Sequence, residues 1–80
     1  MKIGVIGAGS WGTALASVLA EGGVHEVMLW AFEPEVAAGV NKRHQNPLFM
    51  TGESLPVSLK ASNDLAAVVK GAEVLVNGVP

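Results

Sequence analysis

Cysteine is absent from this chain of 80 residues, and charge is scarce. Without cysteine the protein forms neither disulfides nor thiolate metal sites, and its composition fits a reducing compartment such as the cytoplasm. Charged residues make up 15% of the chain and the net charge is −2, so the charge balance gives no general attraction to nucleic acid or to an anionic membrane. The two histidines, His25 and His44, lie far apart without a carboxylate at ligand spacing, and we therefore expect no metal site.

Half of the residues are apolar, which is too many for a disordered tail. A chain of this length makes at most one small domain, and only about 60% of its unfolded surface can be buried. This composition is unusually apolar for an independent domain of that size. We therefore expect the chain to be a piece of a larger protein, with a sheet that further residues complete.

The segment from Ile3 to Ala20 carries no charge, and its glycines are all in its front half. A secretory signal, a membrane span, or a buried strand followed by a turn and a helix would each explain such a segment. Each glycine inside a helix costs about 0.8–1.0 kcal/mol relative to alanine. Because four glycines fall within nine residues, a helical signal or span is disfavoured, and the segment predicts a strand, a tight turn and a helix.

Apolar stretches of strand length alternate with helical segments along the rest of the chain. Strands are predicted over 2–6, 26–30, 57–61 and 73–77, and helices over 10–21, over 34–43 and from a cap at Ser62 or Asn63 to Lys70. Asn46-Pro47 and an irregular loop over 46–56 interrupt the pattern. The first helix has apolar or small residues all round, including Trp11, Ala14, Leu15, Val18 and Leu19, so we expect it to be largely covered.

The order β-α-β-α-β-α-β predicts an α/β fold with a parallel sheet covered on both faces. Right-handed crossovers make it the first half of a Rossmann-type, doubly wound sheet. We expect residues 1–80 to be the N-terminal part of a dinucleotide-binding domain, within a larger enzyme of two domains.

The turn after the first predicted strand reads GAGSWG at positions 7–12, which is the pattern G-x-G-x-x-G. In this context Gly7 permits the tight turn, Gly9 lets a pyrophosphate approach the backbone, and Gly12 lets the helix lie close to the strand. The free N–H groups around Ser10 and Trp11, with the helix dipole, favour a diphosphate. The alternative is a tight turn between strand and helix that binds no ligand.

Glu33 stands 21 residues after Gly12, at the end of the second predicted strand. A carboxylate there accepts hydrogen bonds from ribose hydroxyls and repels a 2′-phosphate. No lysine or arginine lies between Lys2 and Lys42 to offset that repulsion, so NAD is the expected cofactor and NADP the alternative. Glu33 would serve equally well as an acid at the start of a helix. Phe32 is a candidate to pack on the adenine, or else ordinary core.

Several motifs together resemble the N-terminal part of the NAD(P)-dependent glycerol-3-phosphate dehydrogenases. They are GAGSWGTALA at 7–16, HEVMLW at 25–30, HQNPLFMTGESLP at 44–56, the pairs Asp64-Leu65 and Gly71-Ala72, and Val79-Pro80. The resemblance covers essentially the whole chain. Departures are Phe49 for the usual tyrosine, Met50-Thr51 for Leu-Pro, and Asn77-Gly78 where the family is usually apolar, a change expected to loosen the fourth strand and alter the cofactor wall.

The resemblance implies that Ser10 and Trp11 contact the dinucleotide alongside Gly7, Gly9 and Gly12. It also supports NAD, since NAD-specific members carry Trp-x-Phe-Glu, as residues 30–33 do here. The resemblance implies that the substrates of the full enzyme are glycerol 3-phosphate and dihydroxyacetone phosphate. A homodimer is a further partner expectation.

No catalytic residue is expected within residues 1–80, because the family's catalytic lysine and substrate contacts lie in later segments and in a helical C-terminal domain. His44 is tempting as a general acid, but a polar role in capping its loop fits better. The rival hypotheses are a stand-alone, non-catalytic module that senses dinucleotides, and a related dehydrogenase of ketopantoate or 6-phosphogluconate type.

Overall fold

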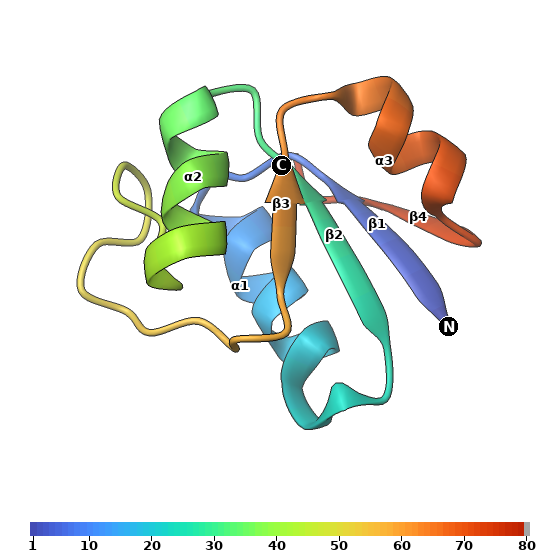
Figure 1. Cartoon of the computed structure of the whole chain (residues 1–80), viewed down its shortest axis with the longest axis horizontal. Coiled ribbons are helices and arrows are strands. Elements are labelled where there is room, and N and C mark those ends of the chain that lie inside the picture. Colours follow the sequence, from blue (N-terminus) through green and yellow to red (C-terminus); the bar gives the residue numbers. More distant parts are fainter. Residues whose placement is uncertain (80) are drawn as a thin grey trace.

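The computed structural model describes residues 1–79, which form a four-stranded sheet flanked by helices (Figure 1). The elements in chain order are β1 (Lys2–Ile6), α1 (Ser10–Ala20), the short 3-10 helix η1 (Glu21–Gly23), β2 (Glu26–Trp30), α2 (Pro34–Arg43), β3 (Lys60–Ser62), α3 (Leu65–Gly71) and β4 (Val74–Asn77). The opening apolar segment is therefore a strand, a turn and a helix, as its glycines predict. Within residues 1–79 no helix has both the length and the apolar character to cross a membrane.

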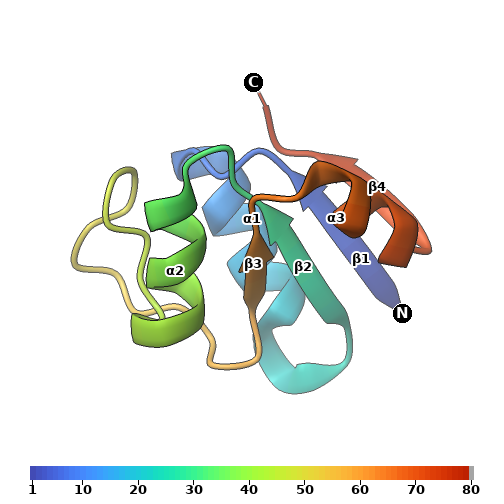
Figure 2. The same cartoon turned by 45° about the horizontal axis from the view of Figure 1, so that its top comes forward.

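All strand pairs are parallel, and the spatial order is β3-β2-β1-β4. Two crossovers lead outward from β1 to β3, and the third returns across the sheet to place β4 on the other side of β1. As a result α1 and α2 cover one face of the sheet and α3 covers the other (Figures 1 and 2). This confirms the predicted Rossmann-type half sheet, and the strand order reverses at β1 and β4.

The core lies mainly between the sheet and the two helices on its first face. The fully buried larger side chains include Val5, Val27, Leu29, Val36, Val40 and Leu59. Alternate residues of the central strands contribute to this layer, and α2 adds its apolar stripe. Leu59 precedes β3 and fills the core although it lies outside the strand.

The prediction that α1 is largely covered is wrong. Its buried residues are the small ones, Gly12, Thr13, Ala16 and Ala20, which face the sheet. Trp11 and Val18 point outward and are 60% and 68% exposed. A stripe of small side chains lets the helix axis approach the strands closely. Trp11 and Val18 are therefore left on the outer side, whereas Leu15 and Leu19 are half-buried and Leu19 packs against the core.

Several element boundaries differ from the predictions, and the two most informative are the start of the third strand and the cap of the third helix. The third strand begins at Lys60 instead of residue 57, because a turn precedes it. In this turn the Leu59 N–H donates to the Pro56 carbonyl at 3.0 Å. The third helix is capped by Asp64, whose carboxylate accepts from the Ala67 N–H at 3.2 Å. Ser62, one of the two predicted caps, instead accepts from the Asp64 N–H through its hydroxyl at 3.0 Å.

The helix α2 spans the predicted residues and ends at His44, which has a left-handed φ of 56°. The His44 carbonyl accepts from the Leu55 N–H at 2.8 Å and so ties the two ends of the following loop together. The capping role expected of His44 is therefore carried by its backbone. Its Nδ1 is buried without a hydrogen-bond partner among the described residues.

Candidate dinucleotide-binding site

The candidate site lies at the carboxyl ends of β1 and β4, where the strand order reverses. Ile6 is in register with Trp30 on one side and with Asn77 on the other. Backbone pairing continues one step beyond the strands, as the Gly7 N–H donates to the Trp30 carbonyl at 3.2 Å and the Gly78 N–H to the Ile6 carbonyl at 2.8 Å. The chain leaves the sheet immediately after Gly7 and enters α1 at Ser10.

Gly7 and Gly12 are required by the fold itself. Gly7 has a backbone φ of +110°, which residues other than glycine rarely adopt. A Cβ at Gly12 would overlap the Gly7 carbonyl oxygen, so α1 meets β1 backbone to backbone. These contacts match the turn and close-packing roles that the motif predicts for the two residues.

Gly78 belongs to the same packed group. A Cβ at this position would lie 2.8 Å from the Gly12 Cα, so the glycine allows the end of β4 to approach α1. Asn77 stabilises the turn that follows, since its side-chain oxygen accepts from the Val79 N–H at 3.0 Å. The expected loosening of the fourth strand is not seen, because β4 keeps its register with β1 through Asn77.

Gly9 is different, because neither its backbone nor its packing requires glycine. Its φ and ψ are −70° and −172°, an extended conformation open to any residue. A Cβ there would meet no atom within 4 Å. The missing side chain leaves open space directly in front of the first turn of α1, which is the place where the motif puts a pyrophosphate.

The N–H groups at this turn are available to an anion. The first intrahelical donor of α1 is Thr13, whose N–H bonds to the Gly9 carbonyl at 3.0 Å. The N–H groups of Ser10, Trp11 and Gly12 precede it and, like the first donors of any helix, have no hydrogen-bond partner among residues 1–79. Together with the helix dipole they form a site for negative charge that needs no lysine or arginine.

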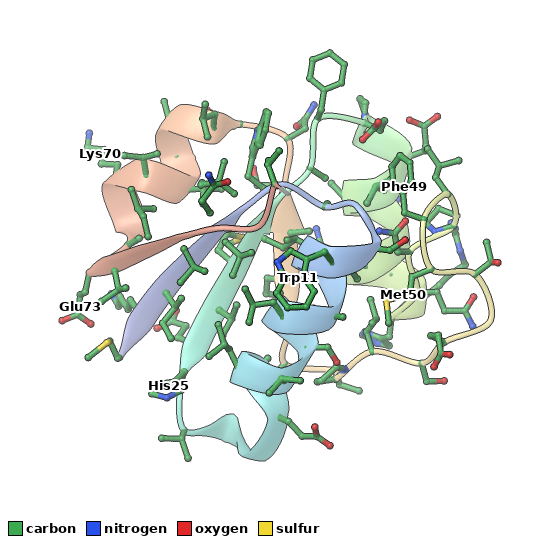
Figure 3. All side chains as sticks on the ribbon, turned by 180° about the vertical axis from the view of Figure 1, so that it is seen from behind. Trp11, His25, Phe49, Met50, Lys70 and Glu73 are labelled. Carbon is green, nitrogen blue, oxygen red and sulfur yellow. The ribbon has the colours of Figure 1, made fainter. Side chains whose placement is uncertain are left out.

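The side chains of Ser10 and Trp11 take different positions. The Ser10 hydroxyl donates to the Phe49 carbonyl at 2.6 Å, so its only proton is used on the neighbouring loop. Trp11 projects from the outer side of the first turn of α1 (Figure 3). The predicted contact of Ser10 with a dinucleotide is therefore best served by its backbone N–H, while the Trp11 ring is free to cover a bound ligand.

Phe32 and Glu33 lie at the carboxyl end of β2, on the same edge of the sheet. Phe32 is 76% exposed, so the alternative of ordinary core is wrong for this residue. Its ring packs edge-to-face on Trp30 at 6.4 Å between centroids, and the Trp30 indole N–H in turn bonds to the Asn63 carbonyl at 3.2 Å. An exposed aromatic ring on a fixed support is suited to stacking on a base.

Glu33 occupies the N-cap position of α2, but its side chain makes no capping hydrogen bond. Its carbonyl accepts from the Val36 N–H at 3.1 Å, so the helix start is supported by the backbone. The carboxylate is half-buried and remains available for other donors such as ribose hydroxyls. The geometry is compatible with both roles considered for this residue, the ribose contact and the acid at a helix start.

Sequence reasoning missed two residues of this region, and the first is Asn46, in a loop whose composition it leaves unexplained. Its side chain is fully buried against the glycine-rich turn. The only signal in the sequence is a polar residue before a proline in an otherwise unstructured stretch, which by itself predicts no more than a turn. Thr13, the buried polar residue of α1 that contacts Asn46, was likewise not singled out.

Two hollows of the described chain lie away from this turn. One is lined by Ile3, Val27, Met28 and residues of α3, and the other by residues around His25 and Glu73 at the amino ends of the strands. His25 and Glu73 are both far from Trp11 in Figure 3. Among residues 1–79, no three His, Cys, Asp or Glu side chains come together as metal ligands. The exposed residues Gly9, Ser10 and Trp11 at the start of α1, called the cradle below, form an open surface outside these two hollows.

Residues 2–80 match the model of a family described as NAD-dependent glycerol-3-phosphate dehydrogenase N-terminus. The chain belongs to this family. The match confirms the resemblance and excludes the alternatives of ketopantoate and 6-phosphogluconate type.

Curated relatives and solved structures agree with the family. A glycerol-3-phosphate dehydrogenase [NAD(P)+] of Trichlorobacter lovleyi is 50% identical over the whole chain, which covers 24% of that relative. One of Stenotrophomonas maltophilia is 52% identical over 89% of the chain and 20% of its own length. The structure of a glycerol-3-phosphate dehydrogenase from Saccharomyces cerevisiae superposes with a TM-score of 0.88 at 35% identity, over the full chain and 26% of the yeast protein. The chain therefore spans about a quarter of the length of the proteins it matches.

Proposed function

We propose that this chain is the segment that binds the dinucleotide in an NAD(P)-dependent glycerol-3-phosphate dehydrogenase. The observation that carries the proposal is the open space at Gly9, which no structural requirement of the fold explains. The family membership and the exposed donors at the start of α1 support it. The diphosphate would lie against the N–H groups of Gly9 to Gly12, with the ribose near Glu33 and the adenine near Phe32.

In the intact protein the bound nicotinamide supplies the hydride acceptor or donor for C2 of glycerol 3-phosphate and dihydroxyacetone phosphate. The part of residues 1–80 in that reaction is orientation. The packed glycines fix the turn between β1 and α1, and the donors of that turn fix the diphosphate. The groups that act on the substrate would lie in a helical C-terminal domain of the same protein, within a cytoplasmic enzyme that forms a homodimer.

NAD is the preferred cofactor of this proposal. Glu33 is an acceptor for ribose hydroxyls and a repulsive charge for a 2′-phosphate, and no lysine or arginine lies between Lys2 and Lys42. Titration of the intact protein with NADH and NADPH tests this directly. We expect tighter binding of NADH. Tighter binding of NADPH would show that the preference is wrong.

The variant Glu33→Ala extends the same experiment. Loss of a charge-assisted hydrogen bond predicts NADH affinity weaker by about tenfold, while NADPH affinity holds or improves. A Glu35→Ala variant is the matched control, because Glu35 lies in the first turn of the same helix and is fully on its outer side. An equal loss in both variants would assign Glu33 to the helix start alone.

An assay of turnover distinguishes the proposed dehydrogenase from the rival hypothesis of a non-catalytic sensor. The intact protein is expected to oxidise NADH with dihydroxyacetone phosphate, followed as loss of nicotinamide absorbance. Binding of NADH without any turnover would favour the sensor instead. If the intact protein showed neither NADH binding nor turnover, both hypotheses would be contradicted.

A further inference from the structure

We propose that Asn46 is a positioning residue for the diphosphate, acting through the peptide unit that joins Ala8 and Gly9. Asn46 holds the Ala8 carbonyl toward the protein interior, and this directs the Gly9 N–H outward into the cradle. The inference rests on the proposed function, since it concerns the same ligand. It assigns a role to Asn46 in the loop 44–56, whose role the sequence alone leaves open.

The contacts of Asn46 form a closed polar group. Its amide nitrogen donates to the Ala8 carbonyl and to the Thr13 hydroxyl, both at 2.9 Å. The Thr13 hydroxyl also donates to the Ala8 carbonyl, at 3.2 Å. Asn46 and Thr13 are both fully buried, so these bonds are shielded from water. Two donors thus hold a single carbonyl oxygen in the glycine-rich turn.

The side-chain oxygen of Asn46 is used as fully as its nitrogen. It accepts from the Leu48 N–H at 3.1 Å and from the Phe49 N–H at 3.0 Å. A primary amide offers two donors and accepts two hydrogen bonds, so all four are satisfied by the protein. Aspartate would lose both donors to the glycine-rich turn, and leucine would also leave the N–H groups of Leu48 and Phe49 without their acceptor. The position therefore requires the amide.

A trans peptide unit is planar, and its C=O and N–H point in opposite directions. Since the Ala8 carbonyl is held inward, the Gly9 N–H must point outward. Gly9 is exposed, and within residues 1–79 its N–H has no protein acceptor. Rotation of this peptide unit would turn the N–H away from the anion and present a carbonyl oxygen to it. Asn46 and Thr13 prevent that rotation.

The same loop has a second attachment to the turn. Asn46 sets the turn 46–50 through its oxygen, and this places the Phe49 carbonyl where it accepts from the Ser10 hydroxyl at 2.6 Å. Phe49 and Met50 lie on this loop beside the first turn of α1 (Figure 3). The loop therefore braces both Ala8 and Ser10, on either side of Gly9.

The test compares Asn46→Ala with Asn41→Ala in the intact protein. Asn41 is a matched control, because its side chain also joins two elements through backbone bonds, donating to the Ala61 carbonyl and accepting from the Ala61 N–H, both at 2.8 Å. Binding of NADH, which carries the diphosphate, and of adenosine, which carries none, is followed by tryptophan fluorescence. We expect Asn46→Ala to weaken NADH binding by about tenfold and adenosine binding by less than about twofold. Asn41→Ala should leave the ratio of the two affinities unchanged.

Thermal unfolding identifies a variant that does not fold. If Asn46→Ala does not fold, Thr13→Val tests the inference instead, since it removes one of the two hydrogen bonds to the Ala8 carbonyl and keeps the shape of the side chain. We expect it to weaken NADH binding by about threefold and to spare adenosine. Equal losses for NADH and adenosine, or an unchanged NADH affinity, in folded Asn46→Ala or Thr13→Val would overturn the inference. Wild-type protein that binds no NADH would instead contradict the proposed function.

Discussion

At the scale of single residues, the structure requires glycine at two positions of the motif and leaves the third open to other residues. Gly7 has a backbone angle that favours glycine, Gly12 lies against the Gly7 carbonyl, and Gly9 borders open space. The sequence pattern predicts the turn at Gly7 and the close packing at Gly12, and the pyrophosphate role of Gly9 stays a prediction. The contacts of Asn46 could not be predicted from the sequence pattern, because its partners Ala8 and Thr13 are 38 and 33 residues away along the chain and no periodicity relates them.

The variant Gly12→Ala tests the close-packing role. The added methyl group would overlap the Gly7 carbonyl oxygen, so α1 must move away from β1. We expect the free energy of unfolding to fall by about 1–3 kcal/mol, measured by urea denaturation. Gly71→Ala is the matched control, because a Cβ there meets no atom within 4 Å and the residue is also helical. Its stability should hold or rise; equal losses in the two variants would contradict the packing argument.

At the scale of elements, the sequence predicts which segments are helices and strands better than it predicts their faces and ends. The apolar residues of α1 occur all round, so no pattern shows which side meets the sheet. The small residues Gly12 and Ala16 decide it, because they permit the closest approach. The start of β3 is similarly uncertain from sequence, since Leu59 is core without being part of the strand.

The cap of α3 gives a prediction at this scale. Asp64 accepts the Ala67 N–H, whereas no side-chain hydrogen bond of Asn63 is found among the described residues. Replacing Asp64 with alanine should lower the free energy of unfolding by about 1 kcal/mol. The neighbouring change Asn63→Ala should alter it by less than about 0.5 kcal/mol. Chemical denaturation of both variants checks the assignment, and the reverse order of effects would return the cap to the position predicted from sequence.

At the scale of the whole molecule, the strand order places the ends of β1 and β4 together at the candidate site. Alternation of strands and helices predicts a doubly wound parallel sheet, and right-handed crossovers reduce the possible strand orders to a few. The outer faces are another matter. Val18, Val69 and Leu75 are exposed apolar side chains, and what lies against them in the intact protein is not encoded in any local pattern of residues 1–80.

This leads to a prediction for residues 1–80 expressed alone. A chain of this length is of marginal stability, and in the proposed site the first turn of α1 would contact a dinucleotide from one side only. We expect NADH to bind at least about tenfold more weakly than to the intact protein, with no reduction of dihydroxyacetone phosphate. Calorimetric titration and a spectrophotometric assay measure the two quantities. Equal affinity, or measurable turnover, would show that the segment is functionally complete.

The most direct test of the account is NADH titration of the variant Gly9→Val in the intact protein. The backbone of Gly9 is compatible with valine and its surroundings are open, so the variant should fold with a melting temperature close to that of the wild type. The account predicts that its isopropyl group occupies the place of the diphosphate and weakens NADH binding by at least about tenfold. Gly71→Val, at an equally open position in α3, should bind NADH as the wild type does. A folded Gly9→Val protein with unchanged NADH affinity would contradict the assignment of this turn as the binding site.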